Sequence, residues 1–94
     1  MDLKKFFELL NTEGLLTFLK EQKIQKLHLD EDDFSILRKN KVSGTSFLYA
    51  DKLDFKEAGL TVFRSVELNN FGNKIISSKY DSVLFIKNKI LILI

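Results

Sequence analysis

The sequence predicts an all-α fold, a small five-helix bundle with an extra helical segment at the amino end and an apolar tail at the carboxyl end. Apolar residues recur at helical spacing from residue 3 to residue 75, and helix-capping residues or glycines separate the segments. The 94 residues are 45% hydrophobic, which is enough for one core. We therefore expect an extension over 1–11, the bundle over 12–77 and the tail over 78–94.

The first two segments are short and closely spaced. Asp2 is the expected cap of a helix over Leu3–Leu10, and Thr12 is the expected cap of a helix over Glu13–Gln22. A single bent helix over 2–22 is the alternative. Residues 23–29 then read as a loop whose apolar side chains cover the core, namely Ile24, Leu27 and Leu29.

The clearest helix signal begins at Asp30. Asp30 is the expected N-cap, and three acids follow in the first turn, where the helix dipole favours negative charge. Phe34 and Leu37 lie one turn apart, with Ile36 beside them. Basic residues gather at the other end of the segment, as the dipole also favours: Arg38, Lys39 and Lys41.

Two glycines divide the middle of the chain. Gly44 and Gly59 each follow a helical segment, and glycine can end a helix with positive φ. Between them, Thr45 is expected to cap a turn that buries Phe47 and Leu48. Asp51 is expected to cap a second short helix, whose apolar contacts come from Leu53, Phe55 and Ala58.

The last helix is the longest and opens at Leu60-Thr61. Gly72 falls inside it and indicates either close packing or an early end near Asn73, since glycine costs about 1 kcal/mol in a helix interior. Its expected buried side consists of Val62, Val66 or Phe63, Leu68, Phe71 and Ile75.

The ordered pattern resembles the sterile alpha motif (SAM) family over about two thirds of the chain. The matching segments are LLTFL at 15–19, EDDFSILRKN at 31–40, VSG at 42–44, FL at 47–48, DKLDFKEAG at 51–59 and LTVFRSVELNNFGNKI at 60–75. Two positions depart from the family pattern. Phe63 stands where many members have glycine, and Phe18 stands where many have Trp or Tyr. The resemblance implies a SAM-like helical bundle that mediates protein association.

Residues suited to catalysis are few, so we expect a protein that is not an enzyme and uses no cofactor. The chain has no cysteine and a single histidine, His28, which lacks partners for a metal shell. The acids at 30–33 lack the spacing of a calcium loop, and helix capping explains them. The four glycines are too far apart to form a phosphate-binding loop.

The SAM resemblance implies head-to-tail association with another SAM-like domain or with a second copy. In such relatives the amino end of the last helix docks on the middle helices of the next molecule. The alternative is that Phe63 packs into its own core and Arg64 is solvated. The expected middle surface consists of Asp30, Asp32, Asp33, Asp51 and Asp54, and the expected helix-end surface consists of Thr61, Phe63 and Arg64.

RNA hairpin binding is the alternative function, because a minority of the family reads RNA loops. The basic residues available for it are interspersed with Glu21 and flanked by Asp30, which makes the positive charge thin. They are Lys20, Lys23 and Lys26, near Arg64 and Lys74.

The tail from Tyr80 to Ile94 does not fit the bundle pattern. Two β-branched runs flank Lys87-Asn88-Lys89, which predicts a hairpin or else an extension of the last helix. Its apolar residues must pack on the domain, a partner copy, a downstream domain or a membrane surface, unless the tail is the end of a longer protein. The longest apolar run, of five residues, is too short to cross a bilayer, and no signal peptide is visible. We expect an intracellular, cytoplasmic scaffold or signalling module.

Overall fold

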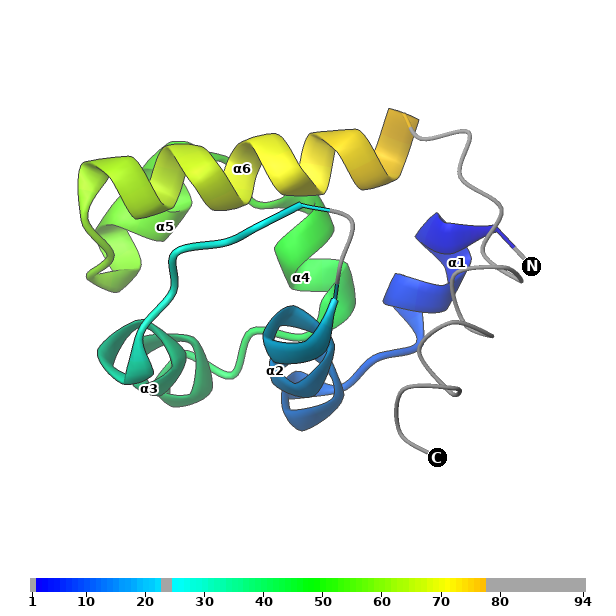
Figure 1. Cartoon of the computed structure of the whole chain (residues 1–94), viewed down its shortest axis with the longest axis horizontal. Coiled ribbons are helices and arrows are strands. Elements are labelled where there is room, and N and C mark those ends of the chain that lie inside the picture. The colour runs from blue at the N-terminus through cyan, green and yellow to red at the C-terminus, as the bar shows by residue number, and fades with distance from the viewer. Residues whose placement is uncertain (1, 23–24, 78–94) are drawn as a thin grey trace.

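The computed structural model describes residues 2–22 and 25–77, and these residues form six α-helices. In Figure 1, α6 runs along one long edge of the molecule, with α5 and α4 beside it, and α2 and α3 lie along the opposite edge. α1 lies at the end away from the start of α6. The helices are α1 (Leu3–Glu8), α2 (Thr12–Glu21), α3 (Glu31–Lys39), α4 (Gly44–Tyr49), α5 (Lys52–Ala58) and α6 (Val62–Ser77).

Phenylalanine rings fill the centre of the bundle. The Phe7 ring centroid lies 4.6 Å from that of Phe18, 6.0 Å from that of Phe47 and 6.4 Å from that of Phe71. These distances are typical of favourable aromatic pairs. Four helices therefore meet at Phe7: its own α1, and α2, α4 and α6.

The first helix packs into this core, and the division into an extension over 1–11 and a bundle over 12–77 stays a prediction. Leu3 and Phe7 of α1 are fully buried in the same cluster as the rings of the other helices. The break at residues 9–11 also shows that 2–22 is two helices rather than one bent helix.

Two of the expected helix caps were wrong, each by one or two residues. Asn11, not Thr12, caps α2 by accepting the Gly14 N–H at 2.8 Å. Ser43, not Thr45, caps α4 by accepting the Ser46 N–H, because α4 already begins at Gly44. The caps expected at Asp2, Asp30 and Asp51 are confirmed.

The two middle glycines have different roles. Gly59 ends α5 in the left-handed region with φ of 118°, as expected. Gly44 does not end a helix, because α3 ends at Lys39 with Asn40 as its C-cap, and the positive φ falls on Lys41. Gly44 donates its N–H to the Leu10 carbonyl at 2.9 Å, and a Cβ there would lie 1.8 Å from the Phe7 carbonyl oxygen. The close approach of α4 to α1 therefore requires glycine.

The predicted buried side of α6 is confirmed for the second half of the helix and is wrong for the first half. Leu68, Phe71 and Ile75 are buried, and the helix passes Gly72 without ending. Side chains near its start that were expected inside are exposed instead, because Ser65 takes the core-facing position in the first turns of α6. Leu53 of α5, also expected to make apolar contacts, is exposed as well. The exposed ones in α6 are Val62, Phe63 and Val66.

Parts of the loop prediction are confirmed, and other predictions concern residues that are not described. Leu27 and Leu29 are half-buried against the core, as expected. Ile24 and the whole tail from Tyr80 to Ile94 lie outside the described residues.

Candidate functional site

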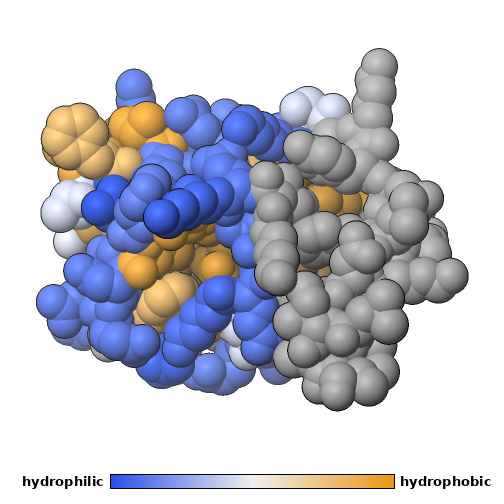
Figure 2. Space-filling model, viewed as in Figure 1, coloured by the Kyte–Doolittle hydropathy of each residue, from blue (hydrophilic) through white to orange (hydrophobic). Residues whose placement is uncertain are grey.

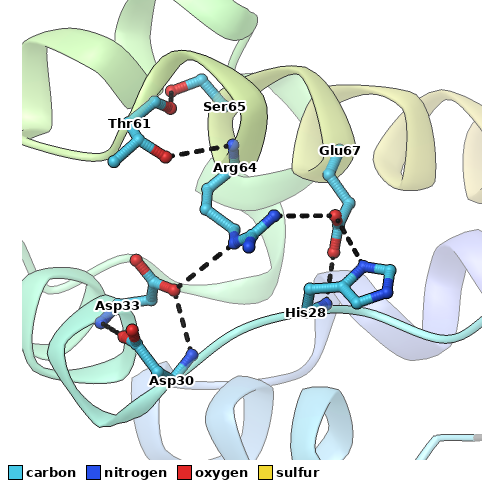
Figure 3. A network of polar contacts seen from close by, with 7 residues as sticks. All are labelled: His28, Asp30, Asp33, Thr61, Arg64, Ser65 and Glu67. Atoms are coloured by element: carbon cyan, nitrogen blue, oxygen red, sulfur yellow. Dashed lines mark hydrogen bonds and ion pairs between the residues drawn. The ribbon is translucent and has the colours of Figure 1, made fainter.

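The start of α6 is held by hydrogen bonds from its own residues. The Thr61 hydroxyl accepts the Arg64 N–H at 3.3 Å, and the Ser65 hydroxyl donates to the Thr61 carbonyl at 2.8 Å. These bonds satisfy polar groups at the helix start. Thr61 therefore orients the first turn of α6, from which Arg64 reaches toward α3 (Figure 3).

Arg64 links α6 to α3 through two carboxylates. Its Nε lies 3.9 Å from Asp33 Oδ2, and its Nη1 donates to Glu67 Oε2 at 3.3 Å. Both carboxylates are largely shielded from solvent, while Arg64 is about one-third exposed. Arg64 was expected on the helix-end surface and Asp33 on the opposing middle surface, but the fold brings the two together within one molecule.

Asp33 is buried and serves the start of its own helix. Its Oδ2 accepts the Asp30 N–H at 3.0 Å, while Asp30 Oδ1 accepts the Asp33 N–H at 2.9 Å. This reciprocal pair is a capping box. Burial raises the pKa of the Asp33 carboxyl above its ordinary value, and the hydrogen bond from Asp30 N and the charge of Arg64 oppose that rise.

Glu67 also ties the loop before α3 to α6. It accepts a hydrogen bond from the His28 backbone N–H, and its Oε2 lies 3.2 Å from His28 Nδ1 (Figure 3). Through these contacts, His28 helps to hold the loop before α3 against α6. The sequence did not show this contact, because His28 and Glu67 are far apart in the chain.

The other acids of the expected middle surface are exposed, and two of them, Asp30 and Asp51, are helix N-caps. Asp51 Oδ1 accepts the Asp54 N–H at 2.9 Å, and Asp54 Oδ2 accepts the Asp51 N–H at 3.0 Å. Asp30 caps α3 in the same way, whereas Asp32 lies exposed in the first turn of α3. Of these acids, Asp30 and Asp32 lie at the start of α3, and Asp51 and Asp54 lie at the start of α5.

Exposed apolar side chains gather where α5 meets the start of α6. Phe63 is 81% exposed, which excludes the alternative that it packs into its own core. Figure 2 shows apolar side chains at the corner where Figure 1 places α5 and the start of α6. We call this set the α5–α6 apolar surface; its members are Leu53, Val62, Phe63 and Val66.

Part of this surface is hollowed into a groove of about 230 Å³. We call it the α5–α6 groove, and it is lined by Lys52, Leu53, Lys56, Val62 and Val66. Sequence reasoning identified Phe63 but missed Lys52, Leu53 and Lys56 as surface residues. The signal was present, because 52 and 56, like 62 and 66, are spaced one helical turn apart.

Metal binding and membrane spanning were also considered for the described residues. Among residues 2–22 and 25–77, no cluster of three or more His, Cys, Asp or Glu side chains could hold a metal ion. No helix within the same residues has the length and apolar character needed to span a membrane.

The basic residues considered for RNA binding contact different groups within the chain. Lys20 Nζ lies 4.9 Å from the centre of the Phe34 ring, and Lys74 Nζ lies 2.6 Å from Gln25 Oε1. Arg64 pairs with acids of its own chain. Lys23 lies outside the described residues.

Comparison with known proteins agrees with the helical pattern. The model of the SAM-like domain family matches residues 2–74, a range that includes α1 and nearly all of α6. No curated protein and no solved structure matches the chain. Because the family match covers most of the chain and the described residues form a small helical bundle, the chain belongs to the SAM-like domain family.

Proposed function

We propose that this chain is a non-catalytic protein association module that docks through the α5–α6 apolar surface. Its partner is another SAM-like domain, and a second copy of the chain is the case we consider first. SAM-like domains are in general interaction modules. The observation that carries the proposal is the 81% exposure of Phe63 on the first turn of α6, among three further exposed apolar side chains.

Phe63 is the main apolar anchor in this proposal. Burying a phenylalanine side chain is worth about 1.5–3 kcal/mol, and aromatic residues at the centre of an interface often dominate binding. Val62 and Val66 lie on the same side of α6 and extend the contact. An exposed group of this kind on a small domain is typical of an interaction surface.

The charged residues divide into two roles. Arg64, Asp33 and Thr61 hold the start of α6 in position, because their polar groups are engaged within the chain. Asp30 and Asp32 lie exposed at the start of α3 and would form the acidic side of the contact on the next molecule. Asp51 and Asp54 form the capping box of α5. Such a contact joins unlike surfaces and forms open chains unless the rotation closes.

Sedimentation velocity of the full chain at several concentrations tests this proposal. We expect concentration-dependent association in the unmodified protein and at least about a tenfold weaker association in Phe63→Ser, which corresponds to about 1.4 kcal/mol. The loss follows from removing the anchor from the interface. Because the ring is exposed in the monomer, the substitution leaves the core intact.

Leu9→Ser is the matched control. Leu9 is 72% exposed and is the C-cap of α1, a helix at the other end of the molecule from the start of α6 (Figure 1). We expect it to associate like the unmodified chain. A monomeric unmodified chain, or equal association in Phe63→Ser and the unmodified chain, would contradict self-association through this surface.

A further inference from the structure

The α5–α6 groove has a basic rim and an apolar floor. Lys52 and Lys56 lie one turn apart on α5, and both are exposed. Leu53, Val62 and Val66 line the groove with aliphatic side chains. This combination is selective, because an occupant must offer an apolar group and negative charge together.

The lysines of the rim are available for contacts with another molecule. Among the described residues, no carboxylate lies within ion-pair distance of Lys52 or Lys56. The nearby acids Asp51 and Asp54 direct their carboxylates to the backbone N–H groups of their own capping box. Within the described residues, the two lysines that line the groove therefore have no carboxylate partner.

The size of the groove favours a side chain as its occupant. Its volume of about 230 Å³ is below the ~300–1,000 Å³ of pockets that bind small molecules. On α3, Phe34 and Leu37 are buried in the core of their own molecule, so neither side chain can enter the groove of a second copy. A partner segment that combines acids with an exposed apolar residue fits better.

We infer that the α5–α6 groove binds an acidic segment of a partner protein, in which one large apolar side chain enters the groove and flanking carboxylates pair with Lys52 and Lys56. The inference rests on the proposed function, since it names the chemistry of the partner at the same surface. Phe63, next to Val62 on α6, packs against the side of the bound segment.

Titration of the ¹⁵N-labelled full chain with synthetic peptides, followed by NMR, tests the inference. The probes are a peptide with one leucine flanked by glutamates, the same peptide with lysines in place of the glutamates, and the glutamate peptide with serine in place of leucine. We expect the first peptide to shift amide signals of Lys52–Lys56 and Val62–Val66. We expect weaker binding at higher salt, because salt screens exposed charge pairs.

Two double variants separate local charge from net charge. Lys52→Glu with Lys56→Glu should weaken binding of the glutamate–leucine peptide by about tenfold, because two attractive pairs become repulsive. Lys5→Glu with Lys39→Glu changes the net charge equally at exposed positions on α1 and α3, and should leave binding unchanged. Equal binding of the lysine or serine peptide, shifts outside the groove, or no shifts at millimolar peptide would overturn the inference.

The peptide and sedimentation experiments can fail independently. Association that depends on Phe63 without peptide binding in the groove would refute only the acidic-segment inference. Peptide binding in the groove by a chain that remains monomeric would refute self-association and leave the partner chemistry standing.

Discussion

At the scale of single residues, Gly44 is the glycine at which the surrounding backbone leaves least room for a side chain. An added Cβ would lie 1.8 Å from the Phe7 carbonyl oxygen and 2.8 Å from its carbonyl carbon, and these backbone atoms cannot rotate away. We expect Gly44→Ala to lower the free energy of unfolding by at least about 2 kcal/mol, by forcing α4 away from α1. Urea unfolding measured by circular dichroism gives this value.

Gly72→Ala is the matched control in a helix interior. A Cβ there would lie 3.5 Å from the Phe47 carbonyl oxygen, which is an ordinary contact. Alanine also favours the helix by about 0.5–1 kcal/mol over glycine, so we expect stabilisation. If both substitutions changed stability alike, the close approach at Gly44 would not be what requires glycine there.

Sequence reasoning recognised that Gly44 was special but gave the wrong reason. Glycine residues at helix ends and at close contacts look the same in a sequence, because both uses depend on the absence of a side chain. Gly59 could be assigned from its neighbours alone, since Asp51 and the short helix locate the end of α5. Gly44 could not, because the atom it approaches belongs to Phe7, 37 residues earlier.

At the scale of elements, the buried Asp33 makes the link between α3 and α6 sensitive to pH. Burial raises the pKa of Asp33 in the folded state above its ordinary 3.8, so the folded chain holds this proton more tightly than the unfolded chain. The stabilisation that comes from tighter binding of this proton is therefore complete below pH 3.8. It is lost as the pH rises through the raised pKa of Asp33. We expect Asp33→Asn to lack this loss when urea unfolding is measured over the same pH range.

The charge of Arg64 provides the control for that pH dependence. Arg64 lowers the pKa of Asp33, in opposition to burial. In Arg64→Gln, the pKa of Asp33 measured by carboxyl ¹³C NMR should therefore rise further. Identical pH slopes for Asp33→Asn and the unmodified chain would show that Asp33 does not govern this dependence.

Most helix starts could be predicted from sequence, whereas the pairing of charges between helices could not. Capping depends on residues three apart, so Asp30 with Asp33 and Asp51 with Asp54 are visible locally. The Asp33–Arg64 contact depends on how α3 and α6 cross. For that reason the sequence assigned Asp33 and Arg64 to opposing surfaces.

At the scale of the whole molecule, the helical class and the order of the helices from α2 to α6 follow from spacing and capping. The place of α1 does not, because its apolar residues show that it needs a partner without showing which one. The break at Asn11 looked like a domain edge in the sequence. In the structure it is a turn that folds α1 back onto the rings of α2, α4 and α6.

A chain that begins at residue 12 tests whether α1 is an extension or part of the core. Its removal takes away the buried side chains of Leu3 and Phe7, each worth about 1.5–3 kcal/mol, and exposes Phe18, Phe47 and Phe71. Small domains are stable by only about 5–15 kcal/mol. We therefore expect residues 12–94 to lose cooperative thermal unfolding and NMR signal dispersion.

Point substitutions show whether that loss comes from the missing core contacts. Phe7→Ala in the full chain should cost about 3–5 kcal/mol, whereas Leu9→Ala at an exposed position should change stability by less than about 0.5 kcal/mol. If residues 12–94 unfolded cooperatively with undiminished stability, α1 would be an added helix and 12–77 the folding unit. If they do not, the α5–α6 apolar surface can be studied only in chains that keep α1, because the same core holds α6 in place.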